Sequence, residues 1–415
     1  MQFKAPRGTM DVLPPESERW RRLNERAAAL FRACGYREII LPVMEHTELF
    51  ARGIGEGSDI VQKEMFVFQD KGGRSLALRP EATAGVARAF IQHRLETSGL
   101  PVKLFYQGPM FRHERPQAGR LRQFHQLGVE LIGSPSPSAD AEVITMCAQF
   151  LAELGVGTDL VLNSVGDENC RPAYLRSLRS YLQERTQSLC PDCRRRAETN
   201  PLRVMDCKSE KCAGVIAGAP SLRDHLCPAC RDHLRGVTEL LREAGVPHRL
   251  DERLVRGLDY YTRTVFEFRD PELGAQNALA AGGRYDHLVE ELGGRPTPAV
   301  GFSIGVERVM LAGPRLGEEE SGGVYVVAIG EEARRRAFGL AFRLRREGYR
   351  VDLDHLERSP KAQMREADRG GFRWCLILGD EELEGGFFTL RDMSSGVQER
   401  VEEERLLESL GERLS

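Results

Sequence analysis

The chain has 415 residues, which is enough for two or three domains that each bury a core. A hydrophobic content of 41% and a charged content of 29% are typical of a soluble protein. The formal net charge of −3 excludes bulk attraction to nucleic acid, so any RNA contact must come from local patches. No apolar run approaches the roughly 20 residues of a membrane span, and the N-terminus lacks a signal-peptide core. We therefore expect a cytoplasmic protein with no membrane partner.

The N-terminal part predicts a helix followed by an interrupted strand. The helix begins near Glu16, after two prolines, and ends at Gly35. The segment 36–50 has strand character, but Pro42 restricts it to an edge or a bulged position. Such an edge suits a contact between subunits, and a simple turn explains the proline equally well.

The region after residue 50 contains no recognisable nucleotide loop. The glycines at 53, 55 and 57 miss the GxGxxG spacing, and no GxxxxGK[ST] occurs in the chain, so any ATP must be bound in another way. The segments EMFVFQD and SLALRP predict a strand pair, and a helix follows from about Thr83. Glu81, just before it, is ordinary helix-start chemistry that complements the helix dipole.

The segment 102–132 predicts two strands joined by a long polar tip. Four arginines crowd this tip: Arg112, Arg115, Arg120 and Arg122. On the return strand, a side-chain period of two places four residues on one face: Phe124, Gln126, Gly128 and Glu130. The opposite face is apolar and belongs to a core. The polar row fits a solvated strand face beside a solubilising hairpin. It fits equally well a ligand with phosphates under the arginines and a smaller polar group near Glu130.

From about Asp167 to Val246 the sequence is helical, charged and rich in cysteine, which predicts an inserted domain. It contains two Cys-x-x-Cys pairs, which predict a tetrahedral zinc site with these ligands: Cys190, Cys193, Cys227 and Cys230. The clustering of thiols in a cytosolic chain favours metal over disulfides. The alternative is that they are helix-turn cysteines without chemical consequence.

The remaining sequence predicts a return to strands and then a separate domain. Arg256 lies just before a predicted strand from Tyr260 to Phe268, where an arginine could reach an anion. A strand leading into a helix follows over PAVGFSIGVERVM. After a solvated linker, residues 323–415 alternate as βαβαβ, which predicts a small α/β domain with a partly parallel sheet.

Several of these segments resemble the histidyl-tRNA synthetase family of class II aminoacyl-tRNA synthetases. FRHERP followed by GRLRQFHQLGVE resembles motif 2, and PAVGFSIGVERVM resembles motif 3. LRPEAT and RGLDYY are similar to segments that bind the amino acid, and Pro42 matches the interface proline of motif 1. The resemblance implies an α+β catalytic core on an antiparallel sheet with a helical insertion, plus a C-terminal α/β anticodon-binding domain. The expected boundaries are 1–166 and 247–317 for the core, 167–246 for the insertion and 323–415 for the last domain.

The resemblance also implies a reaction and its residues. L-histidine would be activated with ATP and Mg²⁺ and transferred to tRNA(His) by a homodimer. Catalysis is assigned to Arg112 and Arg256. Histidine binding is assigned to a larger set: Glu81, Thr83, Gln126, Glu130, Arg256, Tyr260 and Tyr261. ATP binding is assigned to four residues: Arg112, Arg120, Phe124 and Arg308. The family as a whole does not require a metal in the insertion, so the resemblance adds no support for zinc.

A different class of protein shares this core. It is a catalytically inactive paralogue that serves as a regulatory subunit of ATP phosphoribosyltransferase. Such paralogues typically lose the terminal domain and parts of motif 2 and RGLDYY. This chain retains all three, so its sequence favours the enzyme over the regulatory subunit.

Overall fold

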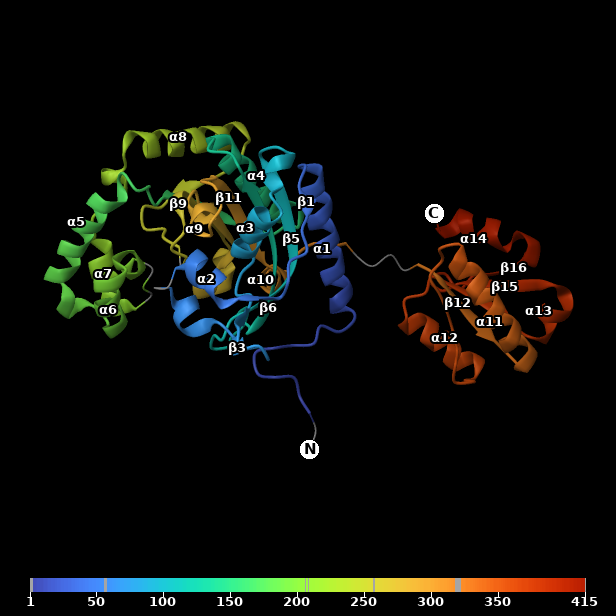
Figure 1. Cartoon of the computed structure of the whole chain (residues 1–415). Coiled ribbons are helices and arrows are strands. Elements are labelled where there is room, and N and C mark those ends of the chain that lie inside the picture. Colours follow the sequence, from blue (N-terminus) through green and yellow to red (C-terminus); the bar gives the residue numbers. More distant parts are fainter. Residues whose placement is uncertain are drawn as a thin grey trace. The chain divides into compact units, whose positions relative to one another are not determined.

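A computed structural model describes residues 3–55, 58–205, 207, 209–256, 258–317 and 322–414. The chain divides into two compact units, Met1–Leu316 and Gly317–Ser415 (Figure 1). Each unit has its own sheet and its own hydrophobic core. Among the described residues, no helix is both long enough and apolar enough to cross a bilayer.

The larger unit is built on an eight-stranded sheet. Across the sheet the order is β1 (Arg37–Glu38), β5 (Val102–Phe111), β6 (Gln123–Ile132), β11 (Ala299–Gly305), β10 (Ala278–Arg284), β9 (Thr262–Arg269), β7 (Asp159–Ser164) and β8 (Arg249–Leu250). The short outer strands β1 and β8 run parallel to their neighbours, and every other pair is antiparallel. The antiparallel core expected from the sequence is confirmed. β1 lies at one edge of the sheet and ends at Glu38, so Pro42 lies outside it and interrupts the predicted strand 36–50.

Helices cover both faces of this sheet. One face packs against α1 (Glu16–Ala33) and α4 (Pro137–Glu153), whose apolar side chains meet Leu127 and Val129 of β6 in the main core. The opposite face packs against α3 (Thr83–Gln92) and α9 (Leu288–Glu291), whose Phe90 and Leu288 share a second core cluster with Ile132 of β6. α10 (Val306–Leu311) follows β11. Because alternate residues of a strand point to opposite faces, the polar row of β6 lies on the side away from α1 and α4.

A smaller three-stranded sheet precedes α3, in the order β2 (Met44–His46), β4 (Ser75–Leu78) and β3 (Val67–Gln69). The hairpin predicted between β3 and β4 is confirmed. The strand predicted to continue to Phe50 is wrong, because α2 (Thr47–Ile54) begins at Thr47. The four-residue spacing of Phe50 and Ile54 places both on one helix face, where they are fully buried in a small cluster. Burial of that face outweighs the strand character of the local sequence.

The insertion between β7 and β8 is mainly helical, as predicted. It contains α5 (Arg171–Glu184), α6 (Pro191–Thr199), α7 (Glu210–Ala217) and α8 (Pro228–Glu243). A buried polar network anchors α8 to the core: Asp140 of α4 lies 3.2 Å from His233 of α8, and it also accepts hydrogen bonds from Arg284 of β10. Arg284 has no exposed side-chain surface, so this ion pair is satisfied entirely inside the protein.

The smaller unit has a five-stranded sheet with the order β13 (Val351–Leu353), β12 (Val324–Ala328), β14 (Trp374–Leu378), β15 (Phe387–Asp392) and β16 (Gln398–Glu402). The first three strands are parallel and the last two are antiparallel. Its helices are α11 (Glu331–Arg346), α12 (Pro360–Arg369), α13 (Asp380–Gly385) and α14 (Leu406–Leu414). The predicted α/β domain with a partly parallel sheet is confirmed.

The packing of β11 against β6 predicts a large effect of one methyl group. A Cβ atom at Gly301 would overlap the Glu130 carboxylate and the Val129 carbonyl oxygen. Gly301→Ala should therefore lower the free energy of unfolding by about 1–3 kcal/mol, the usual range for overpacking. Gly157→Ala is the matched control, because a Cβ there meets nothing within 4 Å. Urea unfolding of both variants tests this, and equal stability for the two would contradict the packing described here.

Candidate active site

A cavity lies on the polar side of the eight-stranded sheet. Side chains from the β5–β6 hairpin, the start of α3, the segment before β9, and strands β10 and β11 line it. It includes every residue to which the sequence assigned histidine or ATP: Glu81, Thr83, Arg112, Arg120, Phe124, Gln126, Glu130, Arg256, Tyr260, Tyr261 and Arg308. Residues up to 227 positions apart, such as Glu81 and Arg308, thus meet in one place.

Glu130 is the buried acid at one end of the cavity, with 1% of its surface exposed. Its carboxylate accepts a hydrogen bond of 2.7 Å from the Thr83 hydroxyl and another from the Tyr285 hydroxyl. Gly301 faces it on β11 and leaves room for the carboxylate. Burial raises the pKa of Glu130 to about 8, although the hydrogen bonds from Tyr285 and Thr83 oppose this shift.

Gln126 and Glu81 complete this acidic end. Gln126 donates from Nε2 to the Ser303 hydroxyl at 3.3 Å, while its buried Oε1 has no hydrogen-bond partner among the described residues. Glu81 accepts backbone hydrogen bonds from Thr83 and Ala84 at 2.7 and 2.9 Å. The helix-start interpretation of Glu81 is therefore confirmed, and the same carboxylate also lines the cavity. Its burial raises its pKa.

Tyrosine rings form the walls around the acidic end. Tyr106 lies opposite Gly128 in the strand register, and its ring occupies the gap that the missing side chain leaves. Tyr260 lies 4.7 Å from Tyr261 and 5.5 Å from Tyr285 between ring centroids. The roles of Tyr106, Ser303 and the Tyr285 hydroxyl were not predicted from the sequence. The glycine in the polar row was a signal for Tyr106, because it marks a place where a large neighbour can enter.

Four arginines line the other end of the cavity. Hydrogen bonds to neighbouring groups fix the positions of their guanidinium groups. Arg256 donates to Glu267 at 2.7 Å. Arg308 donates to the carbonyl oxygens of Ala278 and Gly119 at 2.7 and 3.1 Å.

Arg112 and Arg120 come from the hairpin. Arg112 donates to the Pro80 carbonyl at 2.9 Å, and its guanidinium lies 5.2 Å from the centre of the Phe124 ring. Arg120 forms an ion pair with Glu114, which is itself 8% exposed. These supports fix the directions of all four cations, so the arginines form a fixed basic wall rather than a solvated surface.

Burial and the positive charges of neighbouring arginines lower the pKa values of Arg308 and Arg112. Burial lowers the pKa of Arg308, and the positive charges of Arg120, Arg112 and Arg256 lower it further. Burial likewise lowers the pKa of Arg112, with Arg256 acting in the same direction. Like charges that converge on a half-enclosed cavity are favourable only in the presence of an anion. This end of the cavity is therefore suited to a polyanion such as a chain of phosphates.

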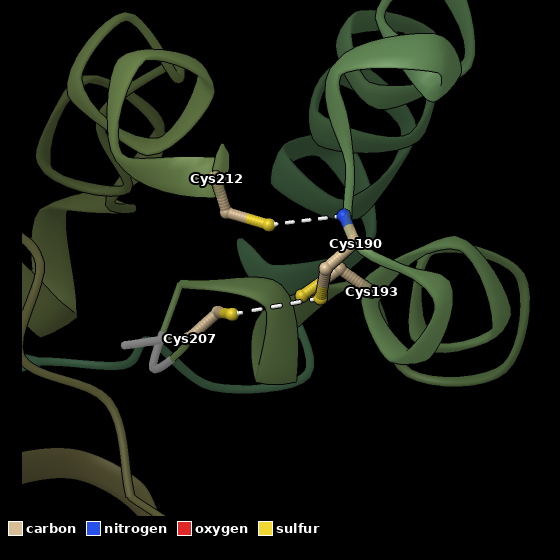
Figure 2. Close-up of side chains that lie close together, drawn as sticks. All are labelled: Cys190, Cys193, Cys207 and Cys212. Carbon is tan, nitrogen blue, oxygen red and sulfur yellow. Dashed lines mark hydrogen bonds between the residues drawn. The ribbon is translucent and has the colours of Figure 1, made fainter. Parts of the chain in front are cut away.

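The structure does not bring together the four cysteines that the sequence assigned to one zinc site. Cys190 and Cys193 lie with Cys207 and Cys212 (Figure 2). Cys227 and Cys230 belong to a different group, with these partners: Asp167 and Cys170. The two Cys-x-x-Cys pairs occupy separate clusters, because α6 and α8 begin in different parts of the insertion. The sequence showed each pair but not its partners.

Comparisons with known proteins identify the family of this chain. The sequence matches the family described as Histidyl-tRNA synthetase over residues 8–309 and the one described as Anticodon binding domain over 323–413. The chain belongs to the histidyl-tRNA synthetase family. A Histidine--tRNA ligase from Halothermothrix orenii is 48% identical over 415 residues, which are 99% of each chain. The solved apo histidyl-tRNA synthetase of S. aureus is 37% identical, with a TM-score of 0.83 over 99% of this chain and 100% of that chain.

The regulatory-subunit alternative has less support. A solved protein named ATP phosphoribosyltransferase regulatory subunit/histidyl-tRNA synthetase, from Bacillus halodurans, covers 91% of this chain and 99% of its own. Its identity is 25% and its TM-score is 0.67, both lower than those of the S. aureus synthetase. Of the two alternatives, the synthetase is therefore better supported than the regulatory subunit.

The raised pKa of Glu130 predicts a specific dependence of stability on pH. The folded state keeps the proton up to about pH 8, whereas the unfolded chain releases it near the usual value of 4.5. Stability from this group is therefore fully present below pH 4.5 and is lost as the pH rises toward 8.

Glu130→Gln cannot ionise and should remove this loss, which reaches at most about 1.4 kcal/mol per pH unit. Urea unfolding of the wild type and the variant at intervals from pH 5 to 9 measures the difference. Parallel stability curves for the two proteins would show that Glu130 has an ordinary pKa in the fold.

Proposed function

We propose that this chain is a histidine–tRNA ligase. It activates L-histidine with ATP to histidyl-adenylate and pyrophosphate, then transfers histidine to the 3′ end of tRNA(His) and releases AMP. The observation that carries the proposal is the division of one cavity into a buried acidic end and a four-arginine end. An amino acid with a basic side chain fits the first, and a nucleoside triphosphate fits the second.

The imidazole of histidine would be read by Glu130, with Tyr261 beside it. Imidazole and a carboxyl with a pKa of about 8 can share one proton at neutral pH, with either group carrying it. A substrate lacking an imidazole N–H would leave this buried acid without a partner. Sites that hydrogen-bond a substrate group reject analogues lacking it by roughly 10⁴–10⁵-fold. Such selectivity would make a separate editing site unnecessary.

The α-amino group of histidine would be held by Glu81, Thr83 and Gln126. The unpartnered Oε1 of Gln126 supports this assignment, because a buried acceptor is satisfied by an ammonium donor. Glu81 keeps its backbone hydrogen bonds while adding negative charge beside that ammonium. Tyr260 would close the wall of the amino-acid pocket, where it contacts Tyr261 and Tyr285.

ATP would enter with Mg²⁺ bridging its phosphates, as part of the substrate. Arg112 and Arg256 would flank the α-phosphate, Arg120 would hold the outer phosphates, and adenine would lie between Phe124 and Arg308. The histidine carboxylate attacks the α-phosphorus in line, and pyrophosphate leaves. No protein base is required, so positioning and charge stabilisation account for catalysis. The hydrogen bonds and ion pairs that fix the arginines favour such charge stabilisation, because cations already in position need not reorganise during the reaction.

The partners follow from the same proposal. The C-terminal unit would contact the anticodon region of tRNA(His), in keeping with its match to an anticodon-binding family. The protein would act as a homodimer in the cytoplasm, where tRNA is charged. Exposed apolar side chains in the segment that follows β1 in the chain support the dimer: Ile40 is 89% exposed and Met44 is 53% exposed. Burial of these side chains against a second copy would be favourable.

ATP–pyrophosphate exchange, measured separately with each of the twenty amino acids, tests the reaction. Exchange should occur with histidine and remain at background with the other nineteen, including glutamine and asparagine. Silence with all twenty amino acids would contradict the proposal and favour the regulatory subunit. Activity with a different amino acid would show that the acidic end has been misassigned.

A matched pair of arginine variants tests the mechanism. Arg256 and Arg269 both form ion pairs with Glu267, at 2.7 and 2.6 Å, but Arg269 is not among the residues that line the cavity. Arg256→Ala should lower the exchange rate by about 100-fold or more, because it removes charge stabilisation of the transition state. Arg269→Ala should stay within a few-fold of wild type. Equal losses in the two variants would mean that Arg256 acts only by holding Glu267.

A further inference from the structure

The two Cys-x-x-Cys pairs share one local geometry. Cys190 and Cys227 are the N-caps of α6 and α8, with ψ angles of 161° and 163° and the same φ of −69°. In each helix a proline follows the N-cap cysteine, and the second cysteine, Cys193 or Cys230, lies in the first turn. Each pair thus presents two thiols on one side of a helix start. A tetrahedral metal needs four ligands, so each pair is half of a site.

The first pair is completed by Cys207 and Cys212. All four sulfur atoms lie within 4.8 Å of one another, and Cys190 Sγ is 3.9 Å from Cys207 Sγ. A zinc ion with Zn–S bonds of about 2.3 Å separates its sulfur ligands by about 3.8 Å.

Backbone amides also point at this cluster. The amide of Cys190 donates to Cys212 Sγ at 3.3 Å (Figure 2). The amide of Ser209 donates to Cys207 Sγ at 3.4 Å. Such hydrogen bonds favour the thiolate form that binds metal.

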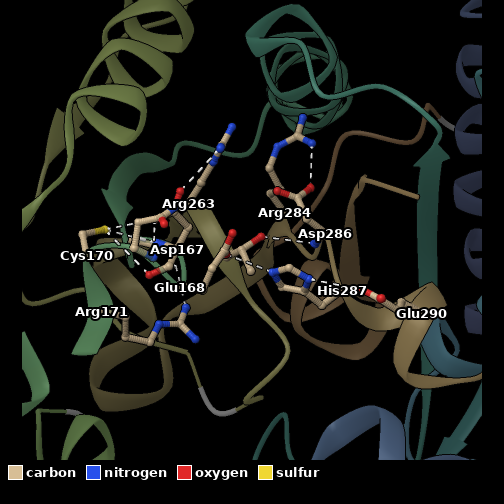
Figure 3. Close-up of polar contacts among 12 residues, drawn as sticks. Asp167, Glu168, Cys170, Arg171, Arg263, Arg284, Asp286, His287 and Glu290 are labelled. Atoms are coloured by element: carbon tan, nitrogen blue, oxygen red, sulfur yellow. Dashed lines mark hydrogen bonds and ion pairs between the residues drawn. The ribbon is translucent and has the colours of Figure 1, made fainter. Parts of the chain in front are cut away.

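The second pair is completed by Asp167 and by Cys170, which is the N-cap of α5. Figure 3 shows these two residues beside each other. Cys170 Sγ lies 3.8 Å from Cys230 Sγ, and Asp167 Oδ1 lies 3.4 Å from Cys170 Sγ and 3.7 Å from Cys227 Sγ. Around a tetrahedral zinc ion, a sulfur and a carboxylate oxygen are separated by about 3.6 Å. The second cluster therefore matches the dimensions of a mixed oxygen–sulfur site.

The surroundings of the second cluster are those of an anionic metal centre. Asp167 is 3% exposed, and its other oxygen accepts a hydrogen bond of 3.4 Å from Arg263. Three thiolates and a carboxylate around a divalent cation leave net negative charge, which this arginine partly neutralises. Disulfides do not explain the spacing, because sulfurs at 3.8–3.9 Å are far beyond a bond of about 2.05 Å.

We propose that the insertion holds two separate zinc ions, one in Cys190–Cys193–Cys207–Cys212 and one in Asp167–Cys170–Cys227–Cys230. The first ion joins the starts of α6 and α7. The second lies where the insertion leaves the catalytic sheet, because Asp167 follows β7 and Arg263 belongs to β9. There the neighbouring Arg171 donates to the carbonyl oxygen of Tyr261, so the second ion would also brace the wall of the amino-acid pocket.

Zinc content of the full-length protein, purified without chelators and measured by mass spectrometry, tests the proposal. The wild type should carry about two equivalents per chain. Cys212→Ser and Cys230→Ser should each retain about one, and the double variant should retain none. Cys34→Ser, outside both clusters, should keep both ions.

A single shared site predicts a different pattern, in which the wild type carries one equivalent and either serine variant loses it. That result, or a wild type with one equivalent or less, would overturn the proposal. Cobalt titration of metal-free wild type avoids dependence on variants that fold poorly. Thiolate-to-cobalt absorption should saturate at about two equivalents, and saturation at one or no such absorption would also refute two sites.

Discussion

Strand β6 is buried on both of its faces, and the arrangement of the catalytic unit depends on this constraint. Its odd-numbered residues from Leu127 onward pack into the core under α1 and α4. On its other face, Phe124, Gln126 and Glu130 line the cavity, and Gln126 and Glu130 are 9% and 1% exposed. A shift of one residue in register would exchange these sets and place a carboxylate in the apolar core. The pairing of β6 with β5 and β11 therefore fixes fold and site together.

Within the described parts of the chain, the acidic and basic ends of the cavity do not pair with each other, because Glu130 and the arginines each have other partners. Glu130 receives hydrogen bonds from two hydroxyl groups and has no arginine partner among the described residues, so no positive charge offsets its burial and its pKa is raised. The arginines have other partners, such as Glu267 for Arg256 and Glu114 for Arg120. This separation preserves an acidic end for a cationic side chain and a basic end for phosphates. A salt bridge across the cavity would have satisfied both ends at the expense of binding.

Local patterns in the sequence predicted the parts of the site that depend on local geometry. The period of two placed Phe124, Gln126 and Glu130 on one face, and family resemblance supplied the residues contributed by distant segments. The contacts that hold these residues could not be read in the same way. Tyr285 lies 155 positions from Glu130, and Ser303 lies 177 positions from Gln126. Their meeting depends on strand order and register, which no local spacing encodes.

The cysteines also show that local spacing does not reveal contacts between distant segments. Spacing identified each Cys-x-x-Cys pair, but the choice of partners depends on where α6 and α8 begin in three dimensions. Asp167 carried no sequence signal as a ligand, because a single aspartate after a strand is common. The helix at Thr47 was missed for a related reason, since burial of Phe50 and Ile54 outweighs local strand character.

The central claim is that one cavity reads imidazole at Glu130 and phosphate at the arginines. A crystal structure of the protein with histidinol and Mg²⁺–ATP tests it most directly, because histidinol lacks the carboxylate that attacks ATP. We predict an imidazole nitrogen within hydrogen-bonding distance of Glu130 and the α-phosphate between Arg112 and Arg256. An imidazole bound away from Glu130, or a triphosphate bound away from these arginines, would contradict it.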